Sequence, residues 1–454
     1  MLLSHLRRNK PNLKRVGLNL PFIRNLCSPT SVLFKTDDSF SHQLPLPSKA
    51  YSQSKMDVWT MFNKAATEFN SVNLGQGFMS FPPHEMVKKA GVDSIVLDSC
   101  SQYSTTRGRP RLLKALANHY SDKLGFKINP DTDVMVSTGA NEDGKNEAIV
   151  MEPAFDQYTP NIEMAGGKVV YIPLRVDPSL EPEKKVISSN DWKLNIKELE
   201  SKINERTKLL IINTPHNPSG KVFSIKELTE IADVAKKYNL LVVSDEVYEN
   251  LYFEGNKHIS IATLPGMFDR TLIVGSMGKS FEVTGWRLGW LIGPKHLIDP
   301  CIKAHTRTVF VSSNPIQEAC AISLENTETT HPTYFSDQRN QYLLRRNKLM
   351  KAFDNVGLPY SVPNGSYFLL VNANRVQIPS DFAIPAHIAE RGKCFIMSYF
   401  FTTEIGVSCI PPSEFYCQED SHLADDYVRF AFCKDDLILE EAAKRLEKVK
   451  KYVK

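Results

Sequence analysis

A lysine directly after an apolar run is the first feature of this sequence that could do chemistry. The run Leu272–Val274 leads through Gly275 and Ser276 to Lys279. Burial at the end of a strand lowers the pKa of a lysine amine, which can then act as a nucleophile. The segment also fits an ordinary surface lysine, whereas a phosphate-binding P-loop would need a glycine where the sequence has Ile273.

An aspartate stands in the corresponding place after another apolar run. Asp245 follows Leu240–Val243 and Ser244, and Tyr248 comes three residues later. A carboxylate in apolar surroundings needs a positive or hydrogen-bonding partner to remain charged, so Asp245 predicts a polar ligand at this strand end. The plainer alternative is that Asp245 is the N-cap of the next helix.

Two further segments present an amide and a guanidinium. The loop Asn213–Gly220 follows the run Leu209–Ile212, and its prolines and glycine hold the side chain of Asn217 in a fixed turn. Arg287 lies eight residues after Lys279 and could return to the same anionic ligand. The alternatives are a simple turn for the loop and a solvated position for the arginine.

The apolar runs themselves predict the element that positions these groups. Short runs of Val, Ile and Leu without polar alternation are typical of strands buried on both faces of a mainly parallel sheet. Helical patterns such as Ser224–Tyr238 lie between several of them, so we expect an α/β layered domain. Open α/β sheets bind ligands beyond the carboxyl ends of their strands, which is where the polar segments begin. The seven runs are Asp133–Val136, Ala148–Met151, Val169–Ile172, Leu209–Ile212, Leu240–Val243, Leu272–Val274 and Leu288–Ile292.

The pattern changes after about residue 330. A polar helical stretch over Tyr334–Phe353 is followed by a turn and a strand over Asn364–Val371, and the chain ends in a charged helix over Leu437–Lys454. This mixture predicts a second domain of the α+β class.

One connection between the predicted strands is short. Only the residues from Ser137 to Glu147 separate the runs Asp133–Val136 and Ala148–Met151, and Asn141–Asn146 has no apolar face to pack. A parallel crossover normally needs about a dozen or more residues, including a helix. Either these two strands are not joined by an ordinary crossover, or the chain lacks a helix here.

The positive charge of the chain is concentrated at its N-terminus. The first 36 residues hold seven of the 55 Lys and Arg residues and no acid, so the remainder has 48 basic against 51 acidic residues. A slightly acidic body gives no electrostatic reason to bind nucleic acid. The basic leader, residues 1–50, is typical of a mitochondrial transit peptide, and we expect a matrix protein. The alternative is a basic tail that targets nothing, on a cytoplasmic protein.

The composition excludes several other classes of protein. With 42% hydrophobic and 23% charged residues the chain is an ordinary globular one, and no run approaches the ~18–20 apolar residues of a membrane-spanning helix. The eight cysteines are scattered and never form C-x-x-C, so we expect reduced or buried thiols and no metal site.

Taken together and in this order, the four polar segments resemble the class I, fold-type I aminotransferases that depend on pyridoxal 5'-phosphate (PLP). The resemblance runs from about Trp59 to the C-terminus. It implies a large PLP-binding domain with a mainly parallel seven-stranded sheet over 83–330, and a smaller α+β domain made of 57–82 and 331–454. Finer features resemble the kynurenine aminotransferases, also known as glutamine transaminase K or cysteine-S-conjugate β-lyase: Asn73–Phe78, Phe81-Pro82-Pro83, Gln102-Tyr103, Glu152–Tyr158 and Gly278.

This resemblance assigns cofactor-binding roles residue by residue. Lys279 would bind PLP through its amine and move the proton at the substrate Cα, while Asp245 would pair with the pyridine nitrogen. Tyr248 and Asn217 would hydrogen-bond the ring oxygen, and Phe155 would stack on the ring face. The phosphate would be held by Ser276, Arg287, the backbone around Gly139, Ala140 and Asn141, and Tyr103 of the partner subunit in a homodimer.

It also assigns the substrate site and the reaction. Arg429 would grip the α-carboxylate as a bidentate fork, close to Gly77 and Asn217, and Trp59 and Phe310 would line the side-chain pocket. The expected reaction moves the amino group of an aromatic amino acid such as kynurenine to a 2-oxo acid. β-Elimination on cysteine conjugates at the same site is one alternative.

A catalytically impaired paralogue is another alternative. Related enzymes have a helix after the residue that matches Asn141, and here that helix is missing. Its loss would remove dipole and amide contacts to the phosphate and uncover one face of a central strand.

Overall fold

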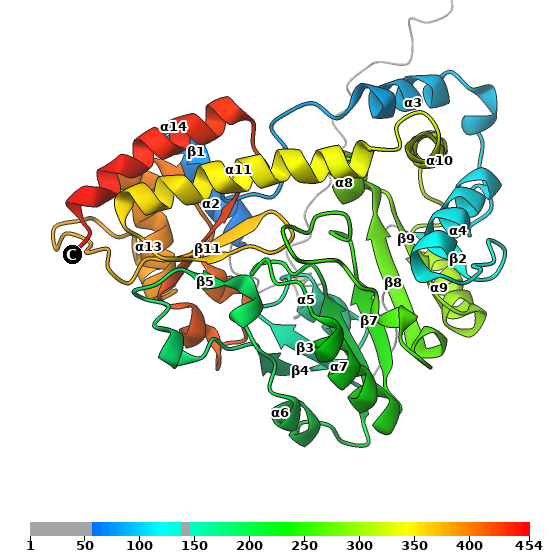
Figure 1. Ribbon diagram of the computed structural model, residues 1–454, viewed down its shortest axis with the longest axis horizontal. Helices are drawn as coiled ribbons and strands as arrows, with labels where there is room; N and C mark the ends of the chain where they lie inside the picture. The colour runs from blue at the N-terminus through cyan, green and yellow to red at the C-terminus, as the bar shows by residue number, and fades with distance from the viewer. Residues whose placement is uncertain (1–56, 138–145) are drawn as a thin grey trace, which may run out of the picture. The chain divides into compact units, whose positions relative to one another are not determined.

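The computed structural model describes residues 57–137 and 146–454, and its main element is a seven-stranded sheet in the order β2-β9-β8-β7-β6-β3-β4 (Figure 1). Strand β9 is antiparallel to both of its neighbours, and all other pairs are parallel. The expected mainly parallel sheet and each of its seven strands are therefore confirmed. The strands are β2 (Val134–Ser137), β3 (Glu147–Glu152), β4 (Lys168–Pro173), β6 (Thr207–Asn213), β7 (Leu241–Asp245), β8 (Thr271–Ser276) and β9 (Gly289–Ile292).

Helices cover this sheet and the smaller sheets beside it. Among the described residues they are α2 (Val58–Glu68), α3 (Glu85–Ile95), α4 (Pro110–Leu124), α5 (Tyr158–Met164), α6 (Ile196–Ser201), α7 (Ile225–Lys237), α8 (Met277–Ser280), α9 (Lys295–Thr308), α10 (Asn314–Glu328), α11 (Tyr334–Val356), α12 (Ala386–Ala389), α13 (Lys393–Phe400) and α14 (Asp436–Leu446). The helices predicted from residues 224, 334 and 437 onward correspond to α7, α11 and α14, so all three are confirmed.

Helix α7 shows how the sequence builds the helical layer. Its N-cap Ser224 and its third residue Glu227 exchange the reciprocal hydrogen bonds of a capping box. Leu228, Ile231 and Ala235 recur on one side of the helix and are buried against the apolar residues of β6 and β7. The amphipathic spacing thus fixes which side of the helix faces the sheet.

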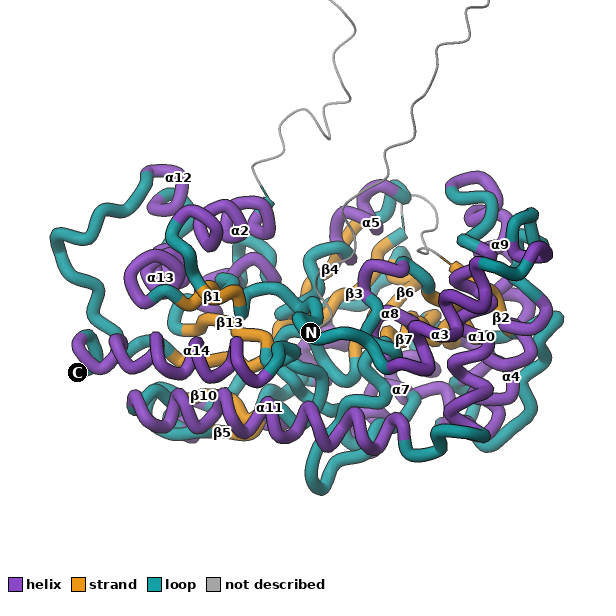
Figure 2. The backbone as a smooth tube through the Cα atoms, turned by 90° about the horizontal axis from the view of Figure 1, so that it is seen from above, coloured by secondary structure: helices purple, strands orange, loops and turns teal. Residues whose placement is uncertain are grey.

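The opposite face of the sheet is covered less completely. Helix α9 packs on a cluster around Leu291, and α5 packs on a separate cluster around Ile211 (Figure 2). Between them Leu209 and Val243 are only partly buried, and Leu241 is 40% exposed. This side of the sheet is therefore partly open among the described residues, and the expected link between that opening and the short connection stays a prediction.

The short connection joins two strands that are not neighbours. Strands β2 and β3 run parallel, with β9, β8, β7 and β6 between them. Residues 138–146 connect them, fewer than the dozen or more of an ordinary crossover with its helix. Parallel strands of one sheet need a crossover, and the choice between the two possibilities that the sequence leaves open stays a prediction. Residues 138–145, with Gly139, Ala140 and Asn141, lie outside the described residues.

Two smaller sheets carry the C-terminal part of the chain. One has the order β13-β11-β10-β5, and the other pairs β1 with β12 in parallel. The described N-terminal residues belong to this part: Leu74 packs with the C-terminal core, and Val58 and Phe62 of α2 pack with Phe395 and Phe415. The division into two domains stays a prediction. The strands are β1 (Val72–Asn73), β5 (Ile187–Ser188), β10 (Tyr360–Val362), β11 (Phe368–Asn372), β12 (Val407–Ser408) and β13 (Tyr427–Ala431).

The cysteines and the helix hydropathy agree with the composition. The seven cysteines among the described residues are free thiols, and five of them are buried. No helix in residues 57–137 and 146–454 combines the length and the apolar character needed to cross a bilayer.

Candidate active site

A cavity of about 710 Å³ runs along one face of the central sheet, from Lys208, Leu241 and Leu272 near the start of three strands to the polar residues at their carboxyl ends. Asn213 ends β6, Asp245 ends β7 and Ser276 ends β8, and all three line it. Lys279 and Arg429 line the same cavity from α8 and β13. Strand ends of an open parallel sheet are the expected place for a ligand, and here they gather an amine, a carboxylate and a guanidinium.

Lys279 sits in the short helix that follows β8. Its Nζ donates to the Tyr367 hydroxyl at 2.8 Å, and that hydroxyl donates to the Gly77 carbonyl oxygen at 2.9 Å. Burial lowers the pKa of the Lys279 amine to about 8. Within the described residues the amine has no carboxylate in ion-pair contact, so a neutral, nucleophilic form is accessible near physiological pH.

The absence of a side chain at Gly77 leaves space for the Tyr367 ring in this chain of hydrogen bonds. A Cβ on Gly77 would lie 2.8 Å from the Tyr367 ring and 3.0 Å from the Phe368 ring. The resemblance places Gly77 close to the substrate carboxylate, and Gly77 lines the cavity. In the structure a side chain at this position would first meet the aromatic ring that holds Lys279.

Asp245 presents its carboxylate at the end of β7. One oxygen accepts from the backbone N–H of Val247 at 3.2 Å, and the other accepts from the Tyr158 hydroxyl. Asn213 holds the strand end by donating to the Asp245 backbone carbonyl at 2.9 Å. Burial raises the pKa of the carboxyl group, so a cationic or N–H donor brought to it would stabilise its charged form.

Tyr248 and Phe155 form part of the cavity wall. Tyr248 is buried, and its ring centre lies 5.6 Å from the Lys279 Nζ. Burial raises the pKa of the Tyr248 hydroxyl, which keeps it a hydrogen-bond donor. The Phe155 ring lines the cavity and packs edge-to-face on Tyr158.

Arg429 is a buried cation with an unused donor. One terminal nitrogen donates to Asn217 Oδ1 at 3.1 Å and the other to the Gly75 carbonyl at 2.9 Å, while the buried Nε has no hydrogen-bond partner. It forms no ion pair with any described residue, and burial lowers its pKa to about 10. A desolvated guanidinium of this kind is suited to bind a carboxylate.

Aromatic rings surround this guanidinium. Ring centres of Phe368, Phe415 and Trp59 lie 4.2, 4.8 and 5.3 Å from its Cζ. The Trp59 indole N–H donates to Asp156 Oδ2 at 2.8 Å, which fixes the ring as a wall of the cavity. Trp59 is therefore placed where the sequence expected it.

The residues expected around the phosphate are brought together only in part. Ser276 and Arg287 line the cavity. Arg287 is exposed, and its guanidinium donates to the Thr284 carbonyl at 3.1 Å. Gly139, Ala140 and Asn141 lie outside the described residues, so their part in holding the phosphate stays a prediction.

Tyr103 and Phe310 are not brought to the cavity of their own chain. Tyr103 is 80% exposed and Phe310 48% exposed, and their rings meet edge-to-face with centres 5.4 Å apart. For Tyr103 this is the position expected of a residue that serves a second subunit. Phe310 was expected at an aromatic position of the substrate pocket; it does not line the cavity of its own chain, and its role in the pocket stays a prediction.

Two tyrosines that contact the site are absent from the sequence predictions. Tyr158 binds Asp245, and Tyr367 binds Lys279. Tyr158 stands in a polar segment directly after an apolar run, which is the signal that found Asp245. Tyr367 directly precedes β11, and nothing in its local sequence points to the lysine 88 residues earlier in the chain.

Comparison with known proteins decides the family. The family described as aminotransferase class I and II matches residues 70–446, most of the chain. The chain belongs to the class I and II aminotransferases. It is 42% identical to a probable kynurenine–oxoglutarate transaminase of Saccharomyces cerevisiae (88% of this chain, 94% of that one). It is 40% identical to a kynurenine–oxoglutarate transaminase of Dictyostelium discoideum (89% and 97%).

A solved structure shows the same fold. The crystal structure of Bna3p from Saccharomyces cerevisiae superposes with a TM-score of 0.86 at 40% identity, covering 90% of this aminotransferase and all of that chain. The fold-type I assignment is confirmed, and the protein is an enzyme that transfers amino groups.

Aminotransferases of this class generally depend on PLP, and the site can be tested for its fit. Three features meet the requirements of that group: an amine with a lowered pKa, a half-buried carboxylate at a strand end, and an aromatic ring that lines the same cavity. The orphaned donor on Arg429 calls for an anion that the chain itself does not supply. The residues present therefore fit the cofactor and an α-carboxylate substrate.

Proposed function

We propose that this aminotransferase binds PLP and moves the amino group of a kynurenine-like aromatic amino acid to a 2-oxo acid. The observation that carries the proposal is that Lys279, Asp245 and Arg429, from three separate elements, line one cavity. The names of relatives that share 40–42% identity over most of the chain support the choice of kynurenine and 2-oxoglutarate.

When bound, PLP supplies an electron sink for the carbanion that forms at the substrate Cα. Asp245 would pair with its ring nitrogen and keep that nitrogen protonated, while Tyr248 and Asn217 would donate to its ring oxygen. Ser276 and Arg287 would hold its phosphate. Lys279 would hold the cofactor before substrate arrives and then carry the proton to and from the substrate Cα, a role that suits an amine with a pKa of about 8.

Arg429 would bind both substrates in turn. An amino acid and a 2-oxo acid share an α-carboxylate, so one guanidinium fork can serve the two halves of a ping-pong cycle. The rings of Trp59, Phe368 and Phe415 beside it favour an aromatic side chain. One carboxylate site with aromatic walls thus supports both the mechanism and the substrate class.

Absorption spectroscopy and a substrate screen test this function. Purified protein loaded with PLP should show a visible absorption band, and Lys279→Ala should lose both the band and turnover. Kynurenine should act as donor with 2-oxoglutarate; its failure while other aromatic donors react would overturn the substrate assignment. Release of pyruvate and ammonia from a cysteine conjugate would reveal the β-elimination activity, and absence of any band would indicate the impaired paralogue.

A homodimer is part of this proposal. Tyr103 is largely exposed and lies away from its own cavity, as expected of a residue that would complete the site of the partner subunit. Val92, Ile95 and Val96 at the end of α3 are 62%, 67% and 74% exposed, an apolar patch of the kind found at subunit interfaces.

We propose the mitochondrial matrix as the location. The support is the acid-free leader with its seven basic residues. Residues 1–50 fused to a fluorescent protein should direct it to mitochondria, and a diffuse cytoplasmic signal would contradict the proposal.

A further inference from the structure

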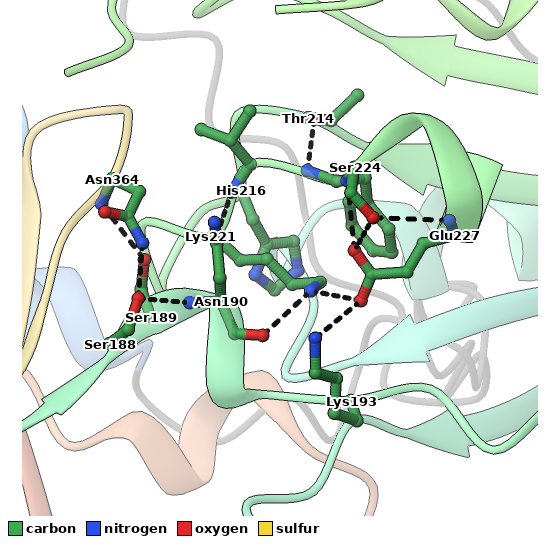
Figure 3. Close-up of polar contacts among 12 residues, drawn as sticks. Ser188, Ser189, Asn190, Lys193, Thr214, His216, Lys221, Ser224, Glu227 and Asn364 are labelled. Carbon is green, nitrogen blue, oxygen red and sulfur yellow. Dashed lines mark hydrogen bonds and ion pairs between the residues drawn. The ribbon is translucent and has the colours of Figure 1, made fainter. Parts of the chain in front are cut away.

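A fully buried lysine lies outside the cavity, beneath the loop that carries Asn217. The Nζ of Lys221 donates to Glu227 Oε1 at 2.7 Å and to the Asn190 backbone carbonyl at 3.4 Å (Figure 3). The side chain of Lys221 is 0% exposed, and its ammonium lies 4.8 Å from the centre of the Phe223 ring. A charge with no access to water depends on these few contacts, so they define where the lysine can lie.

The backbone of Lys221 closes the loop around Asn217. The Lys221 carbonyl accepts from the His216 N–H at 2.8 Å, and the His216 carbonyl accepts from the Gly220 N–H at 2.9 Å. The buried His216 ring meets the Ser219 hydroxyl at 2.7 Å. The residue directly before Asn217, whose side-chain oxygen accepts from Arg429, is therefore hydrogen-bonded to the backbone of Lys221.

The same loop supports the segment that leads to Tyr367. The Gly220 carbonyl accepts from the N–H groups of Asn364 and Gly365 at 3.0 and 2.8 Å, and Ser366 Oγ donates to the His216 carbonyl at 3.1 Å. Gly220 has a φ of +76°, and a Cβ there would lie 2.7 Å from Pro363. The contact is so close that a shift of the loop would reach Tyr367 and, through it, Lys279.

Glu227 joins this loop to helix α7. Its Oε2 accepts from the backbone and hydroxyl of Ser224 at 3.0 and 2.8 Å, while its Oε1 accepts from Lys221 and, at 3.3 Å, from Lys193. Lys193 is 60% exposed. Two lysines therefore donate to the same carboxylate oxygen: Lys221, which is buried, and Lys193, which is exposed to solvent. Lys193 provides a matched control for Lys221.

We propose that Lys221 is a positioning residue of this aminotransferase. Its buried ammonium, clamped between Glu227 and the Asn190 carbonyl, holds the loop 214–223 in the position that aims Asn217 at Arg429 and supports Tyr367 at Lys279. The kinetic part of this inference rests on the proposed function, whereas its structural part concerns the loop alone.

Lys221→Met in the full-length, PLP-loaded protein tests the kinetic part. Because Asn217 would no longer be held against Arg429, KM for both the amino acid and the 2-oxo acid should rise about tenfold, with a smaller change in kcat. The pH midpoint of the visible band should shift, since Tyr367 accepts a hydrogen bond from the Lys279 amine and Asn217 would donate to the ring oxygen of PLP. Lys193→Met should leave both quantities unchanged, because its exposed charge interacts only weakly with Glu227.

Hydrogen exchange without cofactor tests the structural part. Lys221→Met should speed amide exchange in peptides covering 214–223 and 364–367, and Lys193→Met should not. Glu227→Gln leaves the buried ammonium of Lys221 without its counter-charge. It should change KM, the pH midpoint of the visible band and the amide exchange of the loop in the same direction as Lys221→Met. If Lys221→Met does not fold, Glu227→Gln tests the proposal in its place.

A purely structural role would appear as lower thermal stability with unchanged KM, band midpoint and loop exchange, and that result would overturn the inference. A wild-type protein without a visible band or turnover would instead contradict the proposed function. The exchange comparison would still decide the structural part.

Discussion

At the scale of single residues, Arg429 is the residue proposed to bind the substrate carboxylate, and its Nε has no hydrogen-bond partner within the described residues. Arg429→Lys replaces a planar fork by a point charge and loses at least one charge-assisted hydrogen bond to the substrate. A bond of about 1.5–3 kcal/mol corresponds to a rise of about 10- to 100-fold in KM, expected for the amino acid and the 2-oxo acid alike. Steady-state kinetics with both substrates measure it, with the exposed Arg375→Lys as control. A change for one substrate only would contradict a shared carboxylate site.

The charged form of Lys279 is predicted to lower the free energy of unfolding of the cofactor-free protein, by an amount that depends on pH. Burial lowers its pKa from 10.5 to about 8, so the unfolded state binds this proton more tightly than the folded state. The cost of the buried charge is complete below about pH 8 and disappears as the pH rises toward 10.5. Cofactor-free Lys279→Met should therefore be more stable than wild type at pH 7, and the difference should shrink by pH 10.

Urea unfolding midpoints of the two cofactor-free proteins at pH 7 and pH 10 check this prediction. The exposed Lys226→Met serves as control. A difference of equal size at both pH values would show that packing, rather than the charge, distinguishes the variant from wild type.

At the scale of elements, strands β8 and β9 meet at a position that admits only glycine. A Cβ on Gly275 would lie 2.1 Å from the Trp290 Nε1 and 2.8 Å from the Tyr120 hydroxyl, two atoms that bond each other at 3.0 Å. Gly275→Ala should therefore destabilise the fold by about 1–3 kcal/mol, the usual cost of overpacking. Gly285 has no atom within 4 Å of a Cβ, so Gly285→Ala should leave the unfolding midpoint nearly unchanged.

The strands and their ends could be predicted from the sequence more fully than the contacts between them. The strand end that carries Asp245 and the one that leads to Lys279 were predictable, because an apolar run that stops at a polar residue is a local signal. The contacts of Tyr158 and Tyr367 were not, since each joins residues about 90 positions apart and depends on how the sheets pack. The short connection before Glu147 was visible in the sequence as a missing length, whereas the position of Leu209 and Val243 on a partly open side of the sheet needed the structure.

At the scale of the whole molecule, introducing one charged residue into the exposed apolar patch tests the proposed subunit interface. Val96 at the end of α3 is 74% exposed, and Val96→Asp should convert a dimer into monomers with reduced PLP retention, because Tyr103 would no longer reach the partner. Sedimentation or size-exclusion chromatography measures the change. Leu437 is 77% exposed on α14, outside the patch, and Leu437→Asp should leave the oligomeric state unchanged.

The pairing of β1 with β12 has a consequence for synthesis on the ribosome. Val72 pairs with Val407, and Gly75 accepts a hydrogen bond from Arg429. The segment around residues 72–75 is therefore synthesised long before the residues that it contacts in the carboxylate site. At about 5–20 residues per second, roughly 20–70 s separate the two halves. Throughout that interval the apolar side of α2 lacks the later residues Phe395 and Phe415 that cover it, so the growing chain exposes a surface prone to aggregation.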